Sequence, residues 1–599
     1  MRRILVLILF FVLSQGHNVA MSQSDCFSDS VTLRPCDSAT LSSEELNYLI
    51  VTPDNDGIRQ WADTLARFRN EQGISTEVIG INEIGENSPI TLRNYFEEFY
   101  DNLQGHTQQS AILLFGDYDN DPTKGITSFY LTNHPENNIS YLADNKLVDF
   151  NNDDLPEICI ARLPAADARQ AELMVKKTMR YEREPSTNPD YYNRPVTAMG
   201  FEEERWFQLC SEVVAGYFES KGKEPNRLNS IYLGTPDSVW STYENTRLII
   251  DYFGSKGLNY IPDNLKHITD WNANQDNLSY AINEGTFMIQ HRDHGTFQKW
   301  NNPYFSNNEI NNLYNEDLTF IMSANCQTGD FSYGEGDNDC FAERFLRTEN
   351  GAVAVIAASQ ISYSYVNDTY VWGFFDYLWN DFMPDYGNND ICFKYPAFAN
   401  IYGKYFLKQS KWPYLSIHKN LTYNLFHYFG DAFLQLNTEM PQKINLTYPN
   451  EILTDCSSFT ISKDKKTRVA FSVDGELIAT SFGDDNIINI EPFYKEVKIK
   501  VVATKQDYYR HEGYINVKSH LDYDELNIYP NPATDVVYIE GKEIKEVVVY
   551  NTFGQMLMRI NNNSVTEKME LNCSTLKKGL FHLHIIYEDK RVVKSLVVM

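Results

Sequence analysis

Short apolar runs alternate with segments of helical spacing from Leu46 to about residue 437. The runs lie at 46–53, 75–82, 110–117, 157–164, 195–201, 285–290, 318–324 and 351–359, and each predicts a strand buried on both faces. Of the segments between them, 56–73 and 165–184 show helical spacing most clearly, and the second places Ala168, Ala171, Val175 and Met179 on one face. Strands that alternate with helices predict an α/β fold. We therefore expect two mostly parallel sheets flanked by helices, in subdomains 46–187 and 188–437.

The pattern changes after residue 440. Residues 441–523 alternate Thr, Val and Ile with polar residues, and Asp474-Gly475 supplies a turn between two such runs. This pattern predicts a β-sandwich. A second, smaller β unit is expected over 524–599.

The first residues have the shape of a secretory signal. Two arginines precede an apolar stretch from Ile4 to Leu13, and small and polar residues follow. Ten apolar residues are too few to span a bilayer. We therefore expect a signal peptide over 1–22 and a short extension over 23–45. No other segment approaches ~18 uninterrupted apolar residues, so we expect no transmembrane segment after signal removal.

Charge and cysteine content narrow the classes of partner. The formal net charge is −29, from 81 acidic and 52 basic residues, which disfavours nucleic acid and anionic membrane as partners. Nine cysteines are present. Export permits disulfides, and Cys26–Cys36 is the easiest pair to form because these residues are close in sequence. The odd count leaves at least one thiol unpaired.

Two predicted strands end on chemically reactive residues. The run 285–290 leads into His291-Arg292-Asp293-His294-Gly295, and the run 318–324 leads into Asn325 and Cys326. Sites in open parallel sheets form beyond the carboxyl ends of strands. If the two strands are neighbours, a histidine would meet Cys326, where an imidazole favours the thiolate nucleophile and later protonates the leaving amine. Backbone N–H groups at Gly295 and Cys326 could then hold the oxyanion.

Other interpretations of the same residues stay open. Cys326 could be a packed cysteine at a strand end, with the histidines as polar loop residues, and spacing alone does not decide. A metal site is disfavoured, because His291 and His294 lack the spacing of the helical His-Glu-x-x-His motif. A kinase loop is excluded, because the downstream asparagine and the Asp-Phe-Gly motif are missing.

An acidic loop precedes the run 157–164. Asp149, Asn151, Asp153 and Glu157 alternate oxygen ligands in a pattern that could hold a structural calcium ion. The alternatives are a solvated acidic turn, or an acid that selects a basic substrate side chain.

Longer motifs resemble one known family. HRDHGTFQKW (291–300), FIMSANCQTGDF (320–331) and CFAERFLRTENGAVAVIAAS (340–359) are similar to the gingipain-type cysteine peptidases of family C25, and LLFGDYDN, LPEICIARLPA and YFGDAFLQLN match further landmarks. The resemblance covers about 46–437 and implies a caspase-like catalytic domain. It implies protein or peptide substrates and no required cofactor.

The resemblance also assigns roles to residues. Cys326 would be the nucleophile and His294 the general base and acid, with Asp144 orienting the histidine. Asp153 would hold a basic P1 side chain, Arg or Lys, and Tyr365 would form an aromatic wall of that pocket. The family more often has Tyr/Thr-Gly-His-Gly where this chain has Arg-Asp-His-Gly, so the roles of His291, Arg292 and Asp293 stay open.

The tail resembles a second known element. LNIYPNPATDVVYIEG, VVVYNTFGQML, STLKKGLFHLHI and the terminal KRVVKSLVVM are similar to the type IX secretion C-terminal sorting domain, and 441–523 is similar to the immunoglobulin-like module of gingipains. This resemblance implies the type IX machinery as a partner. It implies secretion, or attachment at the outer-membrane surface of a Gram-negative bacterium.

Two functional hypotheses follow. The first is a secreted or surface-attached cysteine endopeptidase. The second is a catalytically inactive surface adhesin or binding protein with the same fold, which a disulfide between Cys326 and Cys340 would favour because it would consume the nucleophile.

Overall fold

The computed structural model describes residues 46–599 except 104–108, 137–138, 238, 334–337, 387–391, 413–415, 520–525, 563–566 and 588–590. The expected signal peptide, the extension 23–45 and the pair Cys26–Cys36 lie outside the described residues.

One mixed sheet organises residues 46–437. Ten strands, counted in the described part of the chain, lie in the order β2-β1-β3-β6-β15-β14-β13-β9-β7-β8. They are β1 (Leu46–Thr52), β2 (Ile74–Gly80), β3 (Ala111–Phe115), β6 (Cys159–Leu163), β7 (Val196–Glu202), β8 (Asn226–Leu233), β9 (Met288–Arg292), β13 (Thr319–Ala324), β14 (Ala352–Ala358) and β15 (Phe426–Phe429). All eight runs predicted from the sequence form strands.

The two expected sheets are halves of this single sheet. Strand β15 joins them, because it pairs antiparallel with β14 and meets β6 through Phe429 and Arg162. Its four residues were not predicted as a strand, since the run is too short and contains His427. The run expected at 285–290 begins later, as β9, and extends through His291 and Arg292.

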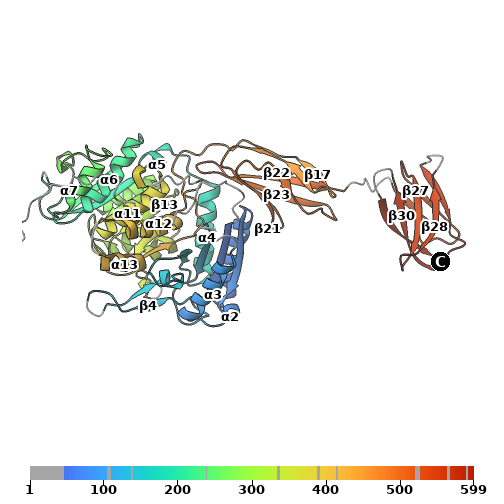
Figure 1. The fold of residues 1–599 in the computed structure, drawn as a ribbon, viewed down its shortest axis with the longest axis horizontal. Coiled ribbons are helices and arrows are strands. Elements are labelled where there is room, and N and C mark those ends of the chain that lie inside the picture. Colours follow the sequence, from blue (N-terminus) through green and yellow to red (C-terminus); the bar gives the residue numbers. More distant parts are fainter. Residues whose placement is uncertain are drawn as a thin grey trace, which may run out of the picture.

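Helices cover both faces of the sheet (Figure 1). They include α1 (Asp56–Asn70), α3 (Pro89–Asn102), α4 (Ala168–Arg183), α6 (Phe207–Ser220), α10 (Phe341–Arg347), α11 (Val366–Leu378) and α12 (Pro396–Gln409). Successive residues of a strand face opposite sides. Tyr48 and Ile50 of β1 accordingly join the core that contains residues of α1 and α4, whereas Leu49 and Val51 join the core that contains residues of α3.

The buried face of α4 differs in part from the expected one. Ala171 and Val175 are buried as predicted, but Ala168 is exposed and Met179 is half-buried. Met174 and Tyr181 are buried instead, so the stripe is rotated relative to the prediction.

Further helices and strands complete the region. The helices are α2 (Ile81–Ile84), α5 (Pro189–Asn193), α7 (Thr246–Phe253), α8 (Gln275–Glu284), α9 (Asn307–Ile310) and α13 (Ser416–Leu425), and the strands are β4 (Phe129–Leu131), β5 (Tyr141–Ala143), β10 (Gly295–Thr296), β11 (Lys299–Trp300) and β12 (Phe305–Ser306). Among the described residues, no helix combines the length and the hydropathy needed to cross a bilayer.

Two β modules follow, coloured orange and red in Figure 1, and each has its own apolar core. The first contains β16 (Leu446–Thr447), β17 (Glu451–Leu453), β18 (Ser458–Thr460), β19 (Ser462–Lys463), β20 (Arg468–Val473), β21 (Glu476–Ser481), β22 (Ile487–Asn489), β23 (Val497–Thr504) and β24 (His511–Lys518). The second contains β25 (Asn527–Tyr529), β26 (Val536–Glu540), β27 (Glu546–Asn551), β28 (Met556–Asn561), β29 (Lys568–Asn572), β30 (Gly579–Ile586) and β31 (Arg591–Val598).

Candidate active site

The strands that precede His294 and Cys326 are neighbours. β9 and β13 run parallel with Arg292 opposite Ala324, so His294 and Cys326 each lie two residues beyond a paired position. The next residue, Gly295, packs directly on the other strand end. A Cβ atom there would come within 2.5 Å of Asn325 Oδ1 and 2.9 Å of the Cys326 carbonyl oxygen. The prediction that these two strands are neighbours is therefore confirmed, and the pairing of the His294 and Cys326 side chains stays a prediction.

Cys326 is a free, half-buried thiol. The Ser362 N–H points to its Sγ at 3.4 Å. The following residue, Gln327, has a φ of 60°, which turns the chain sharply after the cysteine. Cys340 is also a free thiol and is buried, so the alternative disulfide between Cys326 and Cys340 is not formed. The oxyanion role of the Gly295 and Cys326 backbone amides stays a prediction.

The acid that contacts His294 is Glu202, at the end of β7. Glu202 Oε2 lies 2.8 Å from His294 Nε2. Because a carboxylate only accepts, Nε2 carries the hydrogen, and in the neutral ring Nδ1 is the nitrogen that can accept a proton. Burial acts to raise the pKa of Glu202, but the hydrogen bond from His294 and the charge of Arg205 hold that pKa below its usual range. Sequence reasoning missed Glu202, although it directly follows the run predicted at 195–201 and the strand-end rule could have found it.

Two aromatic rings hold the imidazole of His294. The Phe207 ring meets it edge-on at 5.3 Å between centroids, and the Tyr232 ring lies at 4.4 Å. Tyr232 is the extra residue of a bulge in β8, because Phe201 pairs with Ile231 whereas Glu202 pairs with Leu233. Bulges re-aim side chains, and this one directs Tyr232 to the site.

Asp144 does not contact His294. It begins the 3-10 turn η2 (Asp144–Leu147) and forms a buried, two-pronged ion pair with Arg162, with both N–O distances at 2.8 Å. Burial acts to raise the pKa of Asp144, and Arg162 lowers it below its usual value. The imidazole beside Asp144 is that of His427, whose Nδ1 lies 3.9 Å from Asp144 Oδ2. The contact expected of Asp144 is therefore made by Glu202, because β7 rather than η2 adjoins β9.

Asp153 and Tyr365 contact different parts of the molecule. Asp153 is exposed, and its carboxylate lies 3.5 Å from Lys408 Nζ on α12. Tyr365 stacks on Tyr243 at 3.8 Å and donates its hydroxyl to the Glu204 carbonyl at 2.6 Å. Tyr365 therefore lies on one rim of the candidate site, which consists of residues 202–204, Tyr243 and Tyr365. Among the described residues, Asp153 has no hydrogen bond or ion pair with this rim.

His291 and Arg292 form hydrogen bonds that link the ends of β9 and β13. His291 stacks on Trp300, accepts from the Asn325 side chain at 2.9 Å and donates to the Asn302 carbonyl at 3.2 Å. Burial lowers the pKa of His291 to about 3, so it is neutral. Arg292 donates to the Ala324 carbonyl at 3.0 Å and to Asp368, which also accepts from the Tyr365 N–H.

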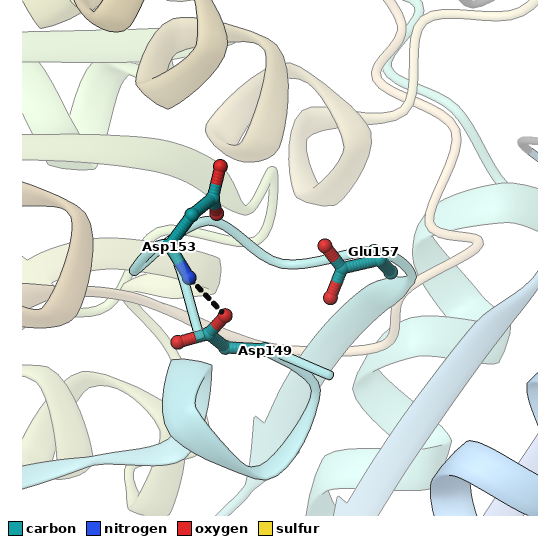
Figure 2. Close-up of side chains that lie close together, drawn as sticks. All are labelled: Asp149, Asp153 and Glu157. Carbon is teal, nitrogen blue, oxygen red and sulfur yellow. Dashed lines mark hydrogen bonds between the residues drawn. The ribbon is translucent and has the colours of Figure 1, made fainter. Parts of the chain in front are cut away.

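Three of the four predicted calcium ligands come together in the loop before β6. Figure 2 shows Asp149, Asp153 and Glu157, and one oxygen of each lies within 4.8 Å of the others. Burial and the charges of Asp149 and Asp153 raise the pKa of Glu157 to about 7. Lys146 contacts Asp149. Asn151 turns its amide nitrogen to Glu157 and its oxygen to the Asp153 N–H, so in this structure it serves the loop.

Comparison with known proteins identifies two segments. Residues 41–437 match the model of peptidase family C25, and 527–599 match the secretion system C-terminal sorting domain. Gingipain R2 of Porphyromonas gingivalis (strain W83) is 22% identical over 552 residues, which cover 89% of this chain and 65% of that protein. Lys-gingipain W83 of the same species is 26% identical over 257 residues, 38% of this chain and 14% of that protein.

Solved structures show the same fold. The crystal structure of the Arg-specific cysteine proteinase gingipain R superposes with a TM-score of 0.63 and 18% identity, covering 80% of this chain and 99% of that one. The complex of the pro- and mature domains of Porphyromonas gingivalis RgpB gives 0.61 and 17%, over 79% and 100%. These likenesses confirm the caspase-like fold.

The sorting domain and the gingipain relatives also support the predicted localisation, secretion with attachment at the outer-membrane surface. The predicted resemblance is confirmed by a family model that covers more than half of the chain. The chain belongs to peptidase family C25.

Proposed function

We propose that this chain is an active cysteine endopeptidase with Cys326 as nucleophile, His294 as general base and acid, and Glu202 as the residue that orients His294. The observation that carries the proposal is the register of β7, β9 and β13, which brings the three residues to one sheet edge. The family supplies protein substrates as the substrate class.

The chemistry follows from these positions. The Cys326 thiolate attacks the scissile carbonyl carbon, and the His294 imidazolium gives its proton to the leaving amine, which leaves a thioester. His294 then removes a proton from water, the resulting hydroxide attacks the thioester carbonyl carbon, and the C–S bond breaks. The new carboxylic acid leaves, and the Cys326 thiolate and the His294 imidazolium are restored. Backbone N–H groups at Gly295 and Cys326 would hold the oxyanion in both steps.

The test is the Cys326→Ala variant. We expect it to fold with an unchanged melting temperature and to hydrolyse no peptide. Cys456→Ala is the matched control, because Cys456 is also a free, half-buried thiol but lies in the first β module. The wild-type protein should be labelled at Cys326 by a thiol-directed peptide probe with a basic P1 residue. Hydrolysis by Cys326→Ala would refute the assignment, and a wild-type protein that neither hydrolyses nor reacts would favour the surface binding protein.

We also propose a preference for Arg or Lys at P1, read by an acid on the rim beside Tyr365. Glu203 and Glu204 follow Glu202 directly, and the Glu203 carbonyl accepts from Thr242, next to the Tyr243 ring that stacks on Tyr365. Cleavage profiles on a peptide library should therefore weaken for basic P1 in Glu203→Gln or Glu204→Gln. Asp153→Asn should keep the wild-type profile, and a change in that variant would restore Asp153 as the specificity residue.

We propose a structural calcium ion at Asp149, Asp153 and Glu157. Three carboxylates in one loop are the hard oxygen ligands that Ca²⁺ prefers.

Calcium at about 100 times its Kd would stabilise the fold by about 2.7 kcal/mol. We expect the melting temperature to rise with Ca²⁺ and fall with chelator, and affinity to increase above pH 7, because Glu157 must lose its proton to bind. Glu157→Gln should abolish the effect, whereas the exposed control Glu98→Gln should keep it. No response in the wild-type protein would exclude the ion.

A further inference from the structure

Asp293 is buried immediately before His294 and is not used by the proposed mechanism. It is 1% exposed, and neither carboxyl oxygen forms a hydrogen bond of ordinary geometry. A buried, unpaired carboxylate is unfavourable, so such groups bind a proton or acquire a partner. Most buried polar groups in proteins have a partner, and an exception beside a catalytic histidine calls for an explanation.

The position of Asp293 relative to β7 is fixed by close packing. A Cβ at Gly200 would collide with the Asp293 carboxyl group, so the two residues are in direct contact. Gly200 and Glu202 are two residues apart on β7 and point to the same face of the sheet. Asp293 therefore approaches from the same side as Glu202, the acid bonded to His294.

Few charged groups surround Asp293 among the described residues. His294 and Arg292 flank it in the chain, and Glu202 lies on the adjoining strand β7. Arg292 directs its guanidinium to Asp368 and to the Ala324 carbonyl. Asn302, which also packs near Gly200, is uncharged. His294 is thus the cation that an ionised Asp293 would affect most directly.

We propose that Asp293 is a positioning residue that acts with Glu202 on His294, and that its ionisation couples the Cys326–His294 pair to pH. The inference rests on the proposed roles of Cys326 and His294. Burial raises the pKa of Asp293 to about 7. The backbone amides of His294 and Asn302 and the charges of His294 and Arg292 offset this only in part. Below pH 7 the carboxyl is neutral and has little effect on His294. Above pH 7 its negative charge favours the imidazolium that the thiolate and the leaving amine require.

The test compares the pH dependence of wild type and Asp293→Asn, which mimics the neutral carboxyl at every pH. We expect kcat/KM of the two proteins to agree within about twofold at pH 5.5. At pH 8.5 the variant should be about tenfold lower, because a shift of one pH unit in the loss of the imidazolium proton corresponds to a factor of ten. A purely structural role would lower kcat/KM by the same factor at every pH, and such parallel profiles would overturn the proposal.

A second readout needs no peptidase activity. A thiolate reacts faster with iodoacetamide once its imidazolium partner loses its proton, so the high-pH inflection of Cys326 alkylation, followed by mass spectrometry, reports the protonation of His294. This inflection should lie about one pH unit lower in Asp293→Asn. If the wild type hydrolyses nothing but the inflection still shifts, the proposed function fails and the role of Asp293 stands. If hydrolysis occurs but the inflection does not move, the role of Asp293 fails alone.

Two further variants control for misfolding of Asp293→Asn and for general effects of replacing a buried aspartate. Asp293→Ser is also uncharged and replaces Asp293→Asn if that variant does not fold. Asp376→Asn is the matched control, because burial raises the pKa of Asp376 to about 8 but this residue contacts Met383 and Tyr402 near the far end of α11. We expect the control to keep the wild-type profile, and the same shift in the control would also overturn the proposal.

Discussion

At the scale of single residues, the hydrogen bond between Glu202 and His294 decides which ring nitrogen carries the hydrogen. Glu202 Oε2 occupies the Nε2 side of the ring at 2.8 Å. The proposed site therefore resembles a triad, in which the proposed nucleophile, base and orienting acid come from the ends of three different strands.

Replacing Glu202 by Gln tests this role. A hydrogen bond to a charged group contributes about 1.5–3 kcal/mol, so we expect kcat/KM to fall by roughly 10- to 100-fold with little change in KM. Steady-state kinetics at pH 7.5 measure the effect. Asp144→Asn should instead lower the melting temperature, because it leaves the buried Arg162 without its ion partner. A larger loss of kcat from a folded Asp144→Asn protein than from Glu202→Gln would return the orienting role to Asp144.

The stability of the fold should also respond to Asp293. Its pKa is about 7 in the folded protein, above the ordinary value of ~3.9 for the unfolded chain. The unfolded state then releases this proton first as pH rises, so the contribution of Asp293 to stability is full below pH 4 and is lost between about pH 4 and 7. We expect Asp293→Asn to melt at a higher temperature than wild type at pH 8, and to lose this advantage at pH 5. Thermal unfolding at the two pH values measures the difference.

At the scale of elements, the bulge in β8 adds Tyr232 to the site. Strand β8 is the edge of the sheet, and its last three residues are exposed. A regular pairing would aim Tyr232 according to the alternation of the strand, whereas the extra residue turns its ring onto His294. Tyr232 is 44% exposed, so its energetic role is local to the imidazole.

Truncating Tyr232 should therefore affect catalysis more than stability. An aromatic contact is worth about 0.5–1.5 kcal/mol, so Tyr232→Ala should lower kcat/KM by roughly 2- to 10-fold at an unchanged melting temperature. Tyr232→Phe keeps the ring and should retain wild-type kinetics. Tyr280→Ala, at an exposed tyrosine on α8, serves as control. Equal losses in Tyr232→Phe and Tyr232→Ala would show that the hydroxyl, and not the ring, matters.

At the scale of the whole molecule, the first β module contacts the catalytic region, residues 46–437, through polar and cation–π interactions. Lys500 Nζ lies 2.6 Å from Glu71 Oε2, and the Arg510 guanidinium covers the Phe68 ring at 4.4 Å. Asp507 accepts from the Thr438 N–H at 2.7 Å. These contacts cover Phe68 and fix Thr438, which directly follows the catalytic region. The second module has a separate core of residues from its own strands.

Truncation should reveal this difference. We expect removal of 441–599 to lower the melting temperature of the catalytic region. In domains of 150–250 residues, each kcal/mol of lost stability lowers the melting temperature by about 2–4 °C, which sets the scale of the expected change. Removal of 524–599 alone should leave that transition unchanged. Differential scanning calorimetry of the full chain and the two shortened chains measures both effects. An unaltered catalytic transition after removal of 441–599 would mean that the interface contributes no stability.

Local patterns in the sequence determined eight strands of the large sheet, the change to β modules after residue 440 and the sorting domain. They also led to the proposal of Cys326 and His294 as the catalytic pair. Burial on both faces makes a strand continuously apolar, and reactive residues such as His294 and Cys326 follow such runs directly. Only the tertiary structure decided which strand ends are neighbours, because the order of strands in the sheet departs from their order in the chain. That order placed Glu202 rather than Asp144 against His294 and joined the two expected sheets through β15. It also buried the Asp293 carboxyl group against Gly200, where, among the described residues, no hydrogen bond of ordinary geometry reaches it.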